Sequence, residues 1–234
     1  MKLSAIQKFT LLDFPGKVAC MAFTPGCDLR CGFCHNPEFV LPEQLCRLAA
    51  SFIPEADFFS FLGQRRGLLE GVVVTGGEPT IWHDLPSFLA EVKRLGFAVK
   101  LDTNGNNSAM LNTCITAGLV DYIAMDVKTS LEQYPSLVGP GVQPERIRES
   151  IVLIRDSGVA HEFRSTLIRE HHTASVLHSM SRLLQGAERV FLQAFRPEQT
   201  LDPAFRDATS FSRNELEIIA SQFGTRVKHV GVRI

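Results

Sequence analysis

The chain has 234 residues, of which 45% are hydrophobic and 21% are charged, and its formal net charge is −1. This composition allows a sizeable core, and the mixing of both charge signs excludes a basic surface for nucleic acid. We find no continuous apolar signal segment near the N-terminus and no apolar run of about 18 residues that would span a bilayer. We therefore expect a cytoplasmic protein that binds neither nucleic acid nor membrane.

Short β-rich runs alternate with amphipathic helical patterns along the chain, which predicts repeated βα units. The predicted strands cover residues 18–24, 71–75, 97–102, 121–126, 161–168 and 189–195. Helices are predicted from Asp84 to Gly96, from Pro144 to Ser157, and from a capping box at Ser212 and Glu215 to Gly224. Residues 226–232 add a small edge strand.

Six βα units are too few for a closed eight-stranded barrel. No internal repeat, low-complexity tract or long linker divides the chain. We therefore predict an α/β fold with a single domain over residues 1–234, built as an open partial (β/α)6 barrel with parallel strands.

Three cysteines follow the first predicted strand in a C-x3-C-x2-C spacing, and they define a loop at residues 25–36: Cys27, Cys31 and Cys34. A [4Fe-4S] cluster takes one thiolate per iron, so three ligands leave one iron open to bind something else. Zinc is the alternative, but a structural zinc site requires a fourth ligand, and His35 is too close to Cys34 to complete a tetrahedron easily. The other cysteines, Cys20, Cys46 and Cys114, are expected to be small buried hydrophobic residues.

Polar and glycine residues follow the other predicted strands, at the end where parallel β/α barrels gather their chemistry. They are Thr75-Gly76-Gly77-Glu78-Pro79, Asp102-Thr103-Asn104-Gly105 and Asp126-Val127-Lys128. In addition, Arg164 lies within the fifth predicted strand, and Gln193 lies near the end of the sixth. The glycine pair is either a tight turn or a place where the backbone approaches a ligand. The two strand-end aspartates require compensation by a cation or a ligand ammonium, and Lys128 is either a surface partner of an acidic neighbour or part of the site.

Together, the cysteine motif and Gly76-Gly77-Glu78-Pro79 resemble the radical S-adenosylmethionine superfamily, whose fold is a partial (β/α)6 barrel. Further motifs are similar to the glycyl-radical-enzyme activating enzymes: Asp13-Phe14-Pro15-Gly16, Cys34-His35-Asn36, Asp102-Thr103-Asn104-Gly105 and Asp126-Val127-Lys128. Within that group the chain most resembles the activating proteins of anaerobic ribonucleoside-triphosphate reductase. Activating enzymes of pyruvate formate-lyase usually read Asp-Gly-Pro-Gly at the first motif, where this chain has Phe14.

The resemblance implies an oxidoreductase that takes a low-potential electron from a donor such as flavodoxin or ferredoxin. The electron cleaves S-adenosylmethionine to methionine and a 5′-deoxyadenosyl radical, which abstracts a hydrogen atom from a backbone glycine of a partner enzyme. Cys27, Cys31 and Cys34 would hold the [4Fe-4S] cluster, and Gly76, Gly77 and Glu78 the methionine moiety. Asp102, Thr103 and Asp126 would line a monovalent cation site, and Arg164 and Gln193 would contact the cofactor.

Two other interpretations remain open at this stage. The chain is similar in size to small-molecule radical enzymes such as the deazaguanine synthases. A non-catalytic iron-sulfur or zinc protein would leave the glycine-rich loop and the strand-end aspartates unexplained. His35 and Asn36 either order the surroundings of the cluster or lie at its rim.

Overall fold

The computed structural model describes residues 1–198 and 200–234, and in it the chain forms two compact units. The first unit comprises Met1–Cys27, Pro37–Thr103 and Ala109–Ile123, and the second comprises Asp28–Asn36, Asn104–Ser108 and Ala124–Ile234. The predicted single domain over residues 1–234 stays a prediction. The α/β fold with a mostly parallel central sheet is confirmed.

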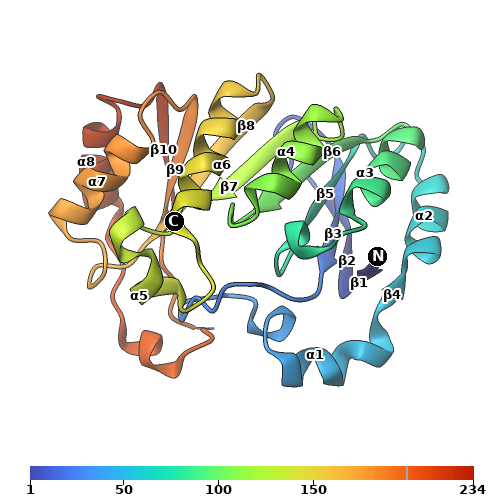
Figure 1. Cartoon of the computed structure of the whole chain (residues 1–234), viewed down its shortest axis with the longest axis horizontal. Helices are drawn as coiled ribbons and strands as arrows, with labels where there is room; N and C mark the ends of the chain where they lie inside the picture. The colour runs from blue at the N-terminus through green and yellow to red at the C-terminus, as the bar shows by residue number, and fades with distance from the viewer. Residues whose placement is uncertain (199) are drawn as a thin grey trace. The chain divides into compact units, whose positions relative to one another are not determined.

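In the first unit, a sheet with strand order β6-β5-β3-β2 is accompanied by helices, and α2 and α3 lie together on one side of it (Figure 1). Strand β5 runs parallel to β3 and to β6, whereas β2 is antiparallel to β3. A separate antiparallel pair joins β1 to β4. The elements are β1 (Lys2–Leu3), β2 (Ala5–Thr10), β3 (Ala19–Thr24), α1 (Pro42–Leu48), β4 (Ile53–Pro54), α2 (Glu55–Gly63), β5 (Gly71–Gly76), α3 (Leu85–Arg94), β6 (Ala98–Thr103) and α4 (Ser108–Thr116).

In the second unit, β8, β9 and β10 are neighbouring parallel strands, and α7 and α8 lie beside them (Figure 1). Strand β7 begins in the first unit and ends in the second, where its end follows β8 in the strand order. The elements are β7 (Tyr122–Asp126), α5 (Tyr134–Val138), α6 (Pro144–Asp156), β8 (Ala160–Leu167), α7 (Ala174–Leu183), β9 (Arg189–Ala194), α8 (Arg213–Phe223) and β10 (His229–Arg233). Short 3-10 helices lie at Pro37–Phe39, Ala49–Ser51, Pro79–Ile81, Leu131–Gln133 and Pro203–Asp207.

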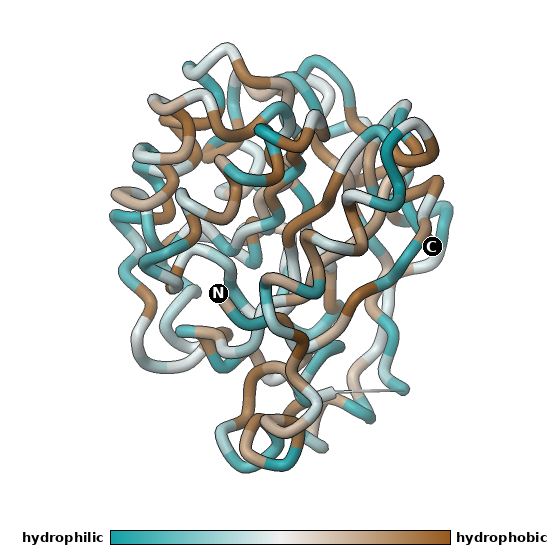
Figure 2. Tube along the Cα trace, turned by 90° about the vertical axis from the view of Figure 1, so that its right-hand side faces the viewer, coloured by the Kyte–Doolittle hydropathy of each residue, from teal (hydrophilic) through white to brown (hydrophobic). Residues whose placement is uncertain are grey.

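All six predicted strands are present, as β3, β5, β6, β7, β8 and β9. Strand β5 is a near-continuous apolar run because both of its faces are covered, and Val72, Val73 and Val74 are fully buried. The hydrophobic stretches of the trace run largely through the strands and the interior, and many peripheral turns are hydrophilic (Figure 2). The predicted edge strand is β10, which pairs with β9.

The three predicted helices are also present, as α3, α6 and α8. Helix α3 ends before Gly96, whose φ of 93° is readily adopted only by glycine. At the start of α8, the Ser212 hydroxyl accepts a hydrogen bond from the Glu215 amide, and the Glu215 side chain accepts one from the Ser212 amide, so the capping box is confirmed. No helix in the described residues is long and apolar enough to cross a membrane.

The expectation of three buried cysteines outside the motif is wrong for one of them. Cys20 and Cys114 are fully buried, whereas Cys46 is exposed on α1. Helix α1 has no buried residue, so its apolar positions do not face a core.

Aromatic packing between α2 and α3 leads to a first prediction. The Phe88 side chain is 1% exposed, and its ring centroid lies 5.6 Å from that of Phe58 and 5.2 Å from that of Phe59. Phe88→Ala leaves a cavity that rigid neighbours fill poorly, so the free energy of unfolding should fall by about 3–5 kcal/mol. Phe9→Ala is the control, because Phe9 is 56% exposed on β2. Urea unfolding of both variants checks this, and similar losses for the two would contradict it.

Candidate cofactor site

The loop that carries the three cysteines begins in the first unit and continues in the second. Within the second unit its backbone is held at several points. The Arg30 amide donates to the Val138 carbonyl (2.9 Å), and the Gly32 carbonyl accepts from the Asp202 amide (2.9 Å). The Cys34 amide donates to the Cys31 carbonyl (3.0 Å), so the last two cysteines share one tight turn. None of the three cysteines is in a disulfide, and all three are partly buried.

Two opposing effects act on the Cys31 thiol. Burial raises the pKa of the Cys31 thiol to about 11, and the nearby Lys128 ammonium opposes that rise. The same ammonium lies 6.0 Å from the centroid of the Phe33 ring. A positive charge favours the deprotonated sulfur that metal ligation requires. Within residues 1–198 and 200–234, no three His, Cys, Asp or Glu side chains converge as a single metal ion needs, but a cluster with one thiolate per iron does not require such convergence.

The glycine-rich loop after β5 packs against the chain that leads to Cys27. The Gly77 amide donates to the Thr24 carbonyl (2.8 Å), and the Glu78 amide donates to the Gly26 carbonyl (2.7 Å). A Cβ atom on Gly77 would lie 1.9 Å from the Gly26 carbonyl oxygen, which no side chain tolerates. The glycine therefore permits close contact between two loops, and the Gly77 and Glu78 amides are both used in that contact.

Glu78 connects this loop to the end of β6. Its carboxylate is buried, with the residue only 1% exposed. One carboxylate oxygen, Oε1, accepts hydrogen bonds from the Thr80 amide (3.1 Å), the Thr80 hydroxyl (2.5 Å) and the Thr103 hydroxyl (2.7 Å). The structure therefore brings the predicted residues Glu78 and Thr103 together. Asp102, the neighbour of Thr103, is ion-paired with the buried Lys100.

At the end of β7, Asp126 is paired with two basic side chains. Its Oδ1 accepts from the Arg164 Nε (2.8 Å), and its Oδ2 accepts from the Lys128 Nζ (2.9 Å). Burial by itself would raise the pKa of Asp126, but Arg164 and Lys128 outweigh burial and hold it well below its usual range. The structure thus brings the predicted site residues Asp126 and Arg164 together and pairs Lys128 with its acidic neighbour, while a role of Lys128 in a cofactor site stays a prediction.

Two residues that we did not predict hold the loop after β7. The Tyr134 hydroxyl accepts from the Lys128 amide (2.9 Å), and the His172 Nε2 lies 2.9 Å from the Lys128 carbonyl oxygen. The His172 Nδ1 accepts from the Ile168 amide (2.9 Å), so the proton lies on Nε2, which donates to Lys128. Both side chains are buried. His172 is 44 residues from Lys128, so no local spacing could have indicated it.

The remaining predicted residues lie in the second unit. In the sheet register Arg164 is opposite Phe191 and Thr166 is opposite Gln193, so Arg164 and Gln193 share a face. His35 is exposed, its Nε2 lies 3.0 Å from the Arg196 carbonyl oxygen, and its ring stacks on Phe195. Asn36 is also exposed. This exposure favours the rim position for His35 and Asn36, which stays a prediction.

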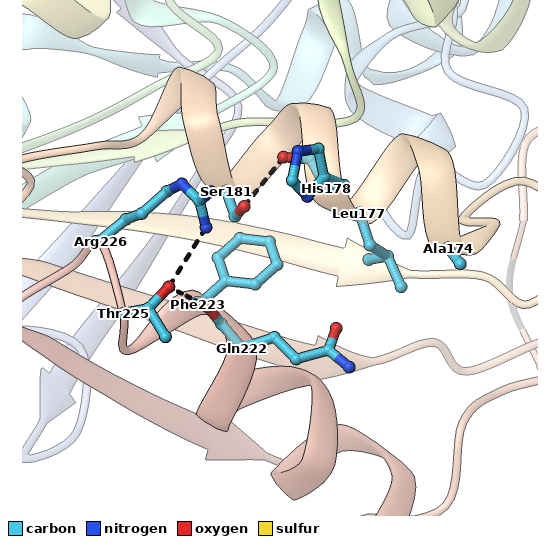
Figure 3. A pocket seen from close by; sticks show the side chains of 8 residues that line it. All are labelled: Ala174, Leu177, His178, Ser181, Gln222, Phe223, Thr225 and Arg226. Carbon is cyan, nitrogen blue, oxygen red and sulfur yellow. Dashed lines mark hydrogen bonds between the residues drawn. The ribbon is translucent and has the colours of Figure 1, made fainter.

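A pocket of about 290 Å³ lies between α7 and α8, and none of the predicted residues lines it (Figure 3). Its wall includes Phe223 and the Ser181 hydroxyl, which donates to the His178 carbonyl (2.8 Å). The Arg226 Nη1 donates to the Thr225 hydroxyl (3.2 Å) at its edge. This pocket is open and partly polar, and the cofactor residues described above lie elsewhere in the fold.

The sequence matches the radical SAM superfamily over residues 21–182. The chain belongs to the radical SAM superfamily. This segment includes the cysteine loop, the glycine-rich loop, Asp126-Val127-Lys128 and Arg164. Membership implies a [4Fe-4S] cluster and S-adenosylmethionine. Three thiols in one loop, one of them near the partly buried Lys128 ammonium, are a donor set that fits such a cluster.

Several known proteins are similar to this radical SAM chain. A protein of Methanocaldococcus jannaschii, by name a candidate glycyl-radical enzyme activating enzyme, is 26% identical over 99% of this chain and 95% of its own length. The 7-carboxy-7-deazaguanine synthase of Geobacter sulfurreducens is 34% identical over 44% of this chain and 46% of its own. The pyruvate formate-lyase-activating enzyme of Staphylococcus aureus is 31% identical over 44% of this chain and 41% of its own. The crystal structure of QueE from Escherichia coli has the same fold, with a TM-score of 0.55, 17% identity, and coverage of 97% of this chain and 92% of that one.

Substitution of the cysteines tests the predicted ligand set. Cys27→Ala, Cys31→Ala or Cys34→Ala should each abolish the visible absorption of a reconstituted [4Fe-4S] cluster, because each removes the thiolate of one iron. Cys46→Ala is the control, because Cys46 is exposed on α1. Iron and sulfide content and absorption spectra after anaerobic reconstitution provide the measurement. A cluster that depended on Cys20 or Cys114 would contradict the assignment.

The ion pairs of Asp126 predict a pH dependence of stability. The folded chain lowers the pKa of Asp126, so the ion pairs stabilise the fold above the ordinary aspartate pKa of about 3.9, and this contribution is lost as the pH falls below that value. Asp126→Asn should lower the free energy of unfolding of the metal-free protein by about 1–3 kcal/mol near pH 7. The difference from the wild type should shrink in urea titrations below about pH 4. The exposed Asp57→Asn on α2 is the control, and a difference for Asp126→Asn that did not vary with pH would rule out this role.

Proposed function

We propose that this radical SAM enzyme is a glycyl-radical-enzyme activase whose partner is anaerobic ribonucleoside-triphosphate reductase. The observation that carries the proposal is the match, over 99% of this chain and 95% of the relative, to a protein named for glycyl-radical enzyme activation. The partial match to a pyruvate formate-lyase-activating enzyme supports the same class. The choice of reductase over pyruvate formate-lyase rests on the motif Asp13-Phe14-Pro15-Gly16, whereas Cys34-His35-Asn36 supports the activating enzymes as a class.

When bound, the cluster and S-adenosylmethionine supply one electron and a 5′-deoxyadenosyl radical, which takes a hydrogen atom from a partner glycine and leaves 5′-deoxyadenosine, methionine and a glycyl radical. A low-potential donor such as flavodoxin or ferredoxin provides the electron. Only glycine allows the radical to be planar without a crowding side chain. All six cysteines are free thiols, which agrees with a cytoplasmic location, where thiols stay reduced.

The residues of the second unit have positioning and electrostatic roles in this proposal. Cys31 and Cys34, together with Cys27, hold the cluster. Lys128 provides positive charge beside Cys31, and Asp126 holds Lys128 in place while also pairing with Arg164. Arg164 and Gln193 lie on one face of neighbouring strands, where they can contact the polar groups of the cofactor.

The residues of the first unit bind the methionine moiety in this proposal. Gly76 and Gly77 allow the loop after β5 to lie against Thr24–Gly26, next to Cys27. Glu78 fixes that loop to Thr103 through Oε1. The monovalent cation near Asp102 and Asp126 stays a prediction; Lys100 pairs with the first carboxylate, and Lys128 and Arg164 pair with the second.

A second candidate function is supported by a specific observation. The deazaguanine synthase of Geobacter sulfurreducens is more similar per residue, at 34% identity, although over only 44% of this chain. In that case the substrate would be a small molecule, and no radical would form on a protein. Activation of pyruvate formate-lyase or another glycyl radical enzyme is the nearer alternative.

The decisive experiment combines the reduced, reconstituted protein with S-adenosylmethionine and candidate glycyl radical enzymes under anaerobic conditions. We expect a glycine-centred doublet in the electron paramagnetic resonance spectrum only with the correct partner. Formation of 5′-deoxyadenosine should be slow without that partner and faster with it, because remote contacts orient the reacting groups.

A peptide of a few residues around the target glycine is the control, and it should be a poorer substrate than the whole partner. Replacement of the target glycine by alanine in the partner should remove the doublet. Stoichiometric turnover of a small metabolite with no protein radical would instead identify the small-molecule enzyme.

A further inference from the structure

Asp28 lies in the cysteine loop, directly after Cys27, and both of its carboxylate oxygens accept hydrogen bonds from asparagine amides. The Asn104 Nδ2 donates to Oδ1 (2.8 Å), and the Asn106 Nδ2 donates to Oδ2 (2.7 Å). All three residues belong to the second unit. We propose that Asp28, Asn104 and Asn106 form a clamp that positions the cysteine loop for its cluster. The inference rests on the cluster ligands of the proposed function.

The two asparagines cannot turn their amides away from Asp28 without losing other bonds. The Asn106 Oδ1 accepts from the Gln143 amide (2.9 Å), and its Nδ2 also donates to the Gly141 carbonyl (3.1 Å). The Asn104 Oδ1 accepts from the Asn106 amide (2.8 Å). The Oδ1 atom of each asparagine therefore accepts a hydrogen bond from a backbone amide, so the Nδ2 group is the one that faces the Asp28 carboxylate. Asn104 and Asn106 are 6% and 4% exposed, so these bonds have little competition from water.

The loop that carries the asparagines is itself fixed to the fold. Gly105 has a φ of 77°, and a Cβ atom there would lie 2.1 Å from the Met125 methyl group. The Gly105 carbonyl accepts from the buried Ser150 hydroxyl on α6 (2.7 Å). Met125 immediately precedes Asp126 on β7. The clamp thus ties the cysteine loop to the same strand that carries the Asp126 ion pairs.

The clamp requires that both carboxylate oxygens of Asp28 accept hydrogen bonds. A substitution that replaces one of these oxygens by a donor therefore tests it. Asp28→Asn keeps the shape of the side chain but replaces one acceptor oxygen by an NH2 group, which then faces an amide donor. Asn106→Asp in the same chain supplies an acceptor for that new NH2 group. The paired substitution Asp28→Asn with Asn106→Asp therefore restores complementarity, although it loses the bond to Gly141. Asp156→Asn is the matched control, because Asp156 is an exposed carboxylate at the end of α6.

The experiment measures the rate at which the reconstituted, full-length protein releases iron to a ferrous chelator, without S-adenosylmethionine or a partner. We expect Asp28→Asn to release iron about tenfold faster than the wild type, as is usual when a residue that orients metal ligands is lost. The paired variant should recover much of the difference, and Asp156→Asn should match the wild type. The midpoint temperatures of thermal unfolding of the metal-free variants should differ far less than their rates of iron release.

Two outcomes would overturn the clamp. The first is an unchanged rate of iron release in Asp28→Asn, and the second is an equally fast rate in the single and paired variants. If Asp28→Asn does not fold, the same comparison with Asn104→Ala, which removes one donor to Asp28 together with the acceptor for the Asn106 amide, decides the matter. Failure of the wild type to take up a cluster would instead refute the proposed function. An error in the proposed partner protein would not affect the iron-release measurement, which uses no partner.

Discussion

A carboxylate at the end of a buried strand must be neutralised, and the way this happens at Asp126 determines much of the second unit. Arg164 from β8 and Lys128 from the following loop approach its two oxygens. The cost of desolvating three charged groups is offset only because each has a partner at close range. As a result Lys128 is held where its positive charge acts on Cys31, and the end of β7 is joined to β8 by side chains as well as by the sheet.

In the first unit, two loops lie so close together that no side chain fits between them. Gly77 lies so close to the Gly26 carbonyl that its hydrogen atom occupies the only available space. The amides of Gly77 and Glu78 are used to bind the Thr24–Gly26 segment. A ligand at this loop must therefore rely on other groups of the same segment, and the glycines serve it by fixing the shape of the loop.

The sequence predicted the fold well where the signal is local. Buried parallel strands such as β5 appear as apolar runs, and the helix ends at Gly96 and Ser212 follow from backbone geometry. Strand β2 was missed because Gln7, Lys8 and Phe9 are all exposed, so it lacks the alternation of a half-buried strand. Cys46 was expected to be buried because its neighbours in the sequence are apolar. Apolar neighbours in the sequence do not ensure that this face of the helix packs against a core.

For the site, residue type and position at a strand end indicated which groups matter, but not their partners. The pairing of Asp126 with Lys128 spans two residues, whereas its pairing with Arg164 spans 38. Asn106 and His172 act through hydrogen bonds to groups far away in the sequence, and no periodic pattern records such bonds. Only the folded chain shows that Asp28, next to a predicted ligand, is bound by two amides.

The hydrogen bonds of His172 join two loops into one dynamic unit. Its ring accepts from the Ile168 amide on one side and donates to the Lys128 carbonyl on the other, and the Lys128 amide is in turn bound to Tyr134. Because the imidazole is rigid, neither loop can move away without breaking a bond to the other. An opening that exposes the Ile168 amide hydrogen to solvent therefore also disturbs the bond from His172 to the Lys128 carbonyl, so hydrogen exchange at Ile168 reports on the loop after β7 as well.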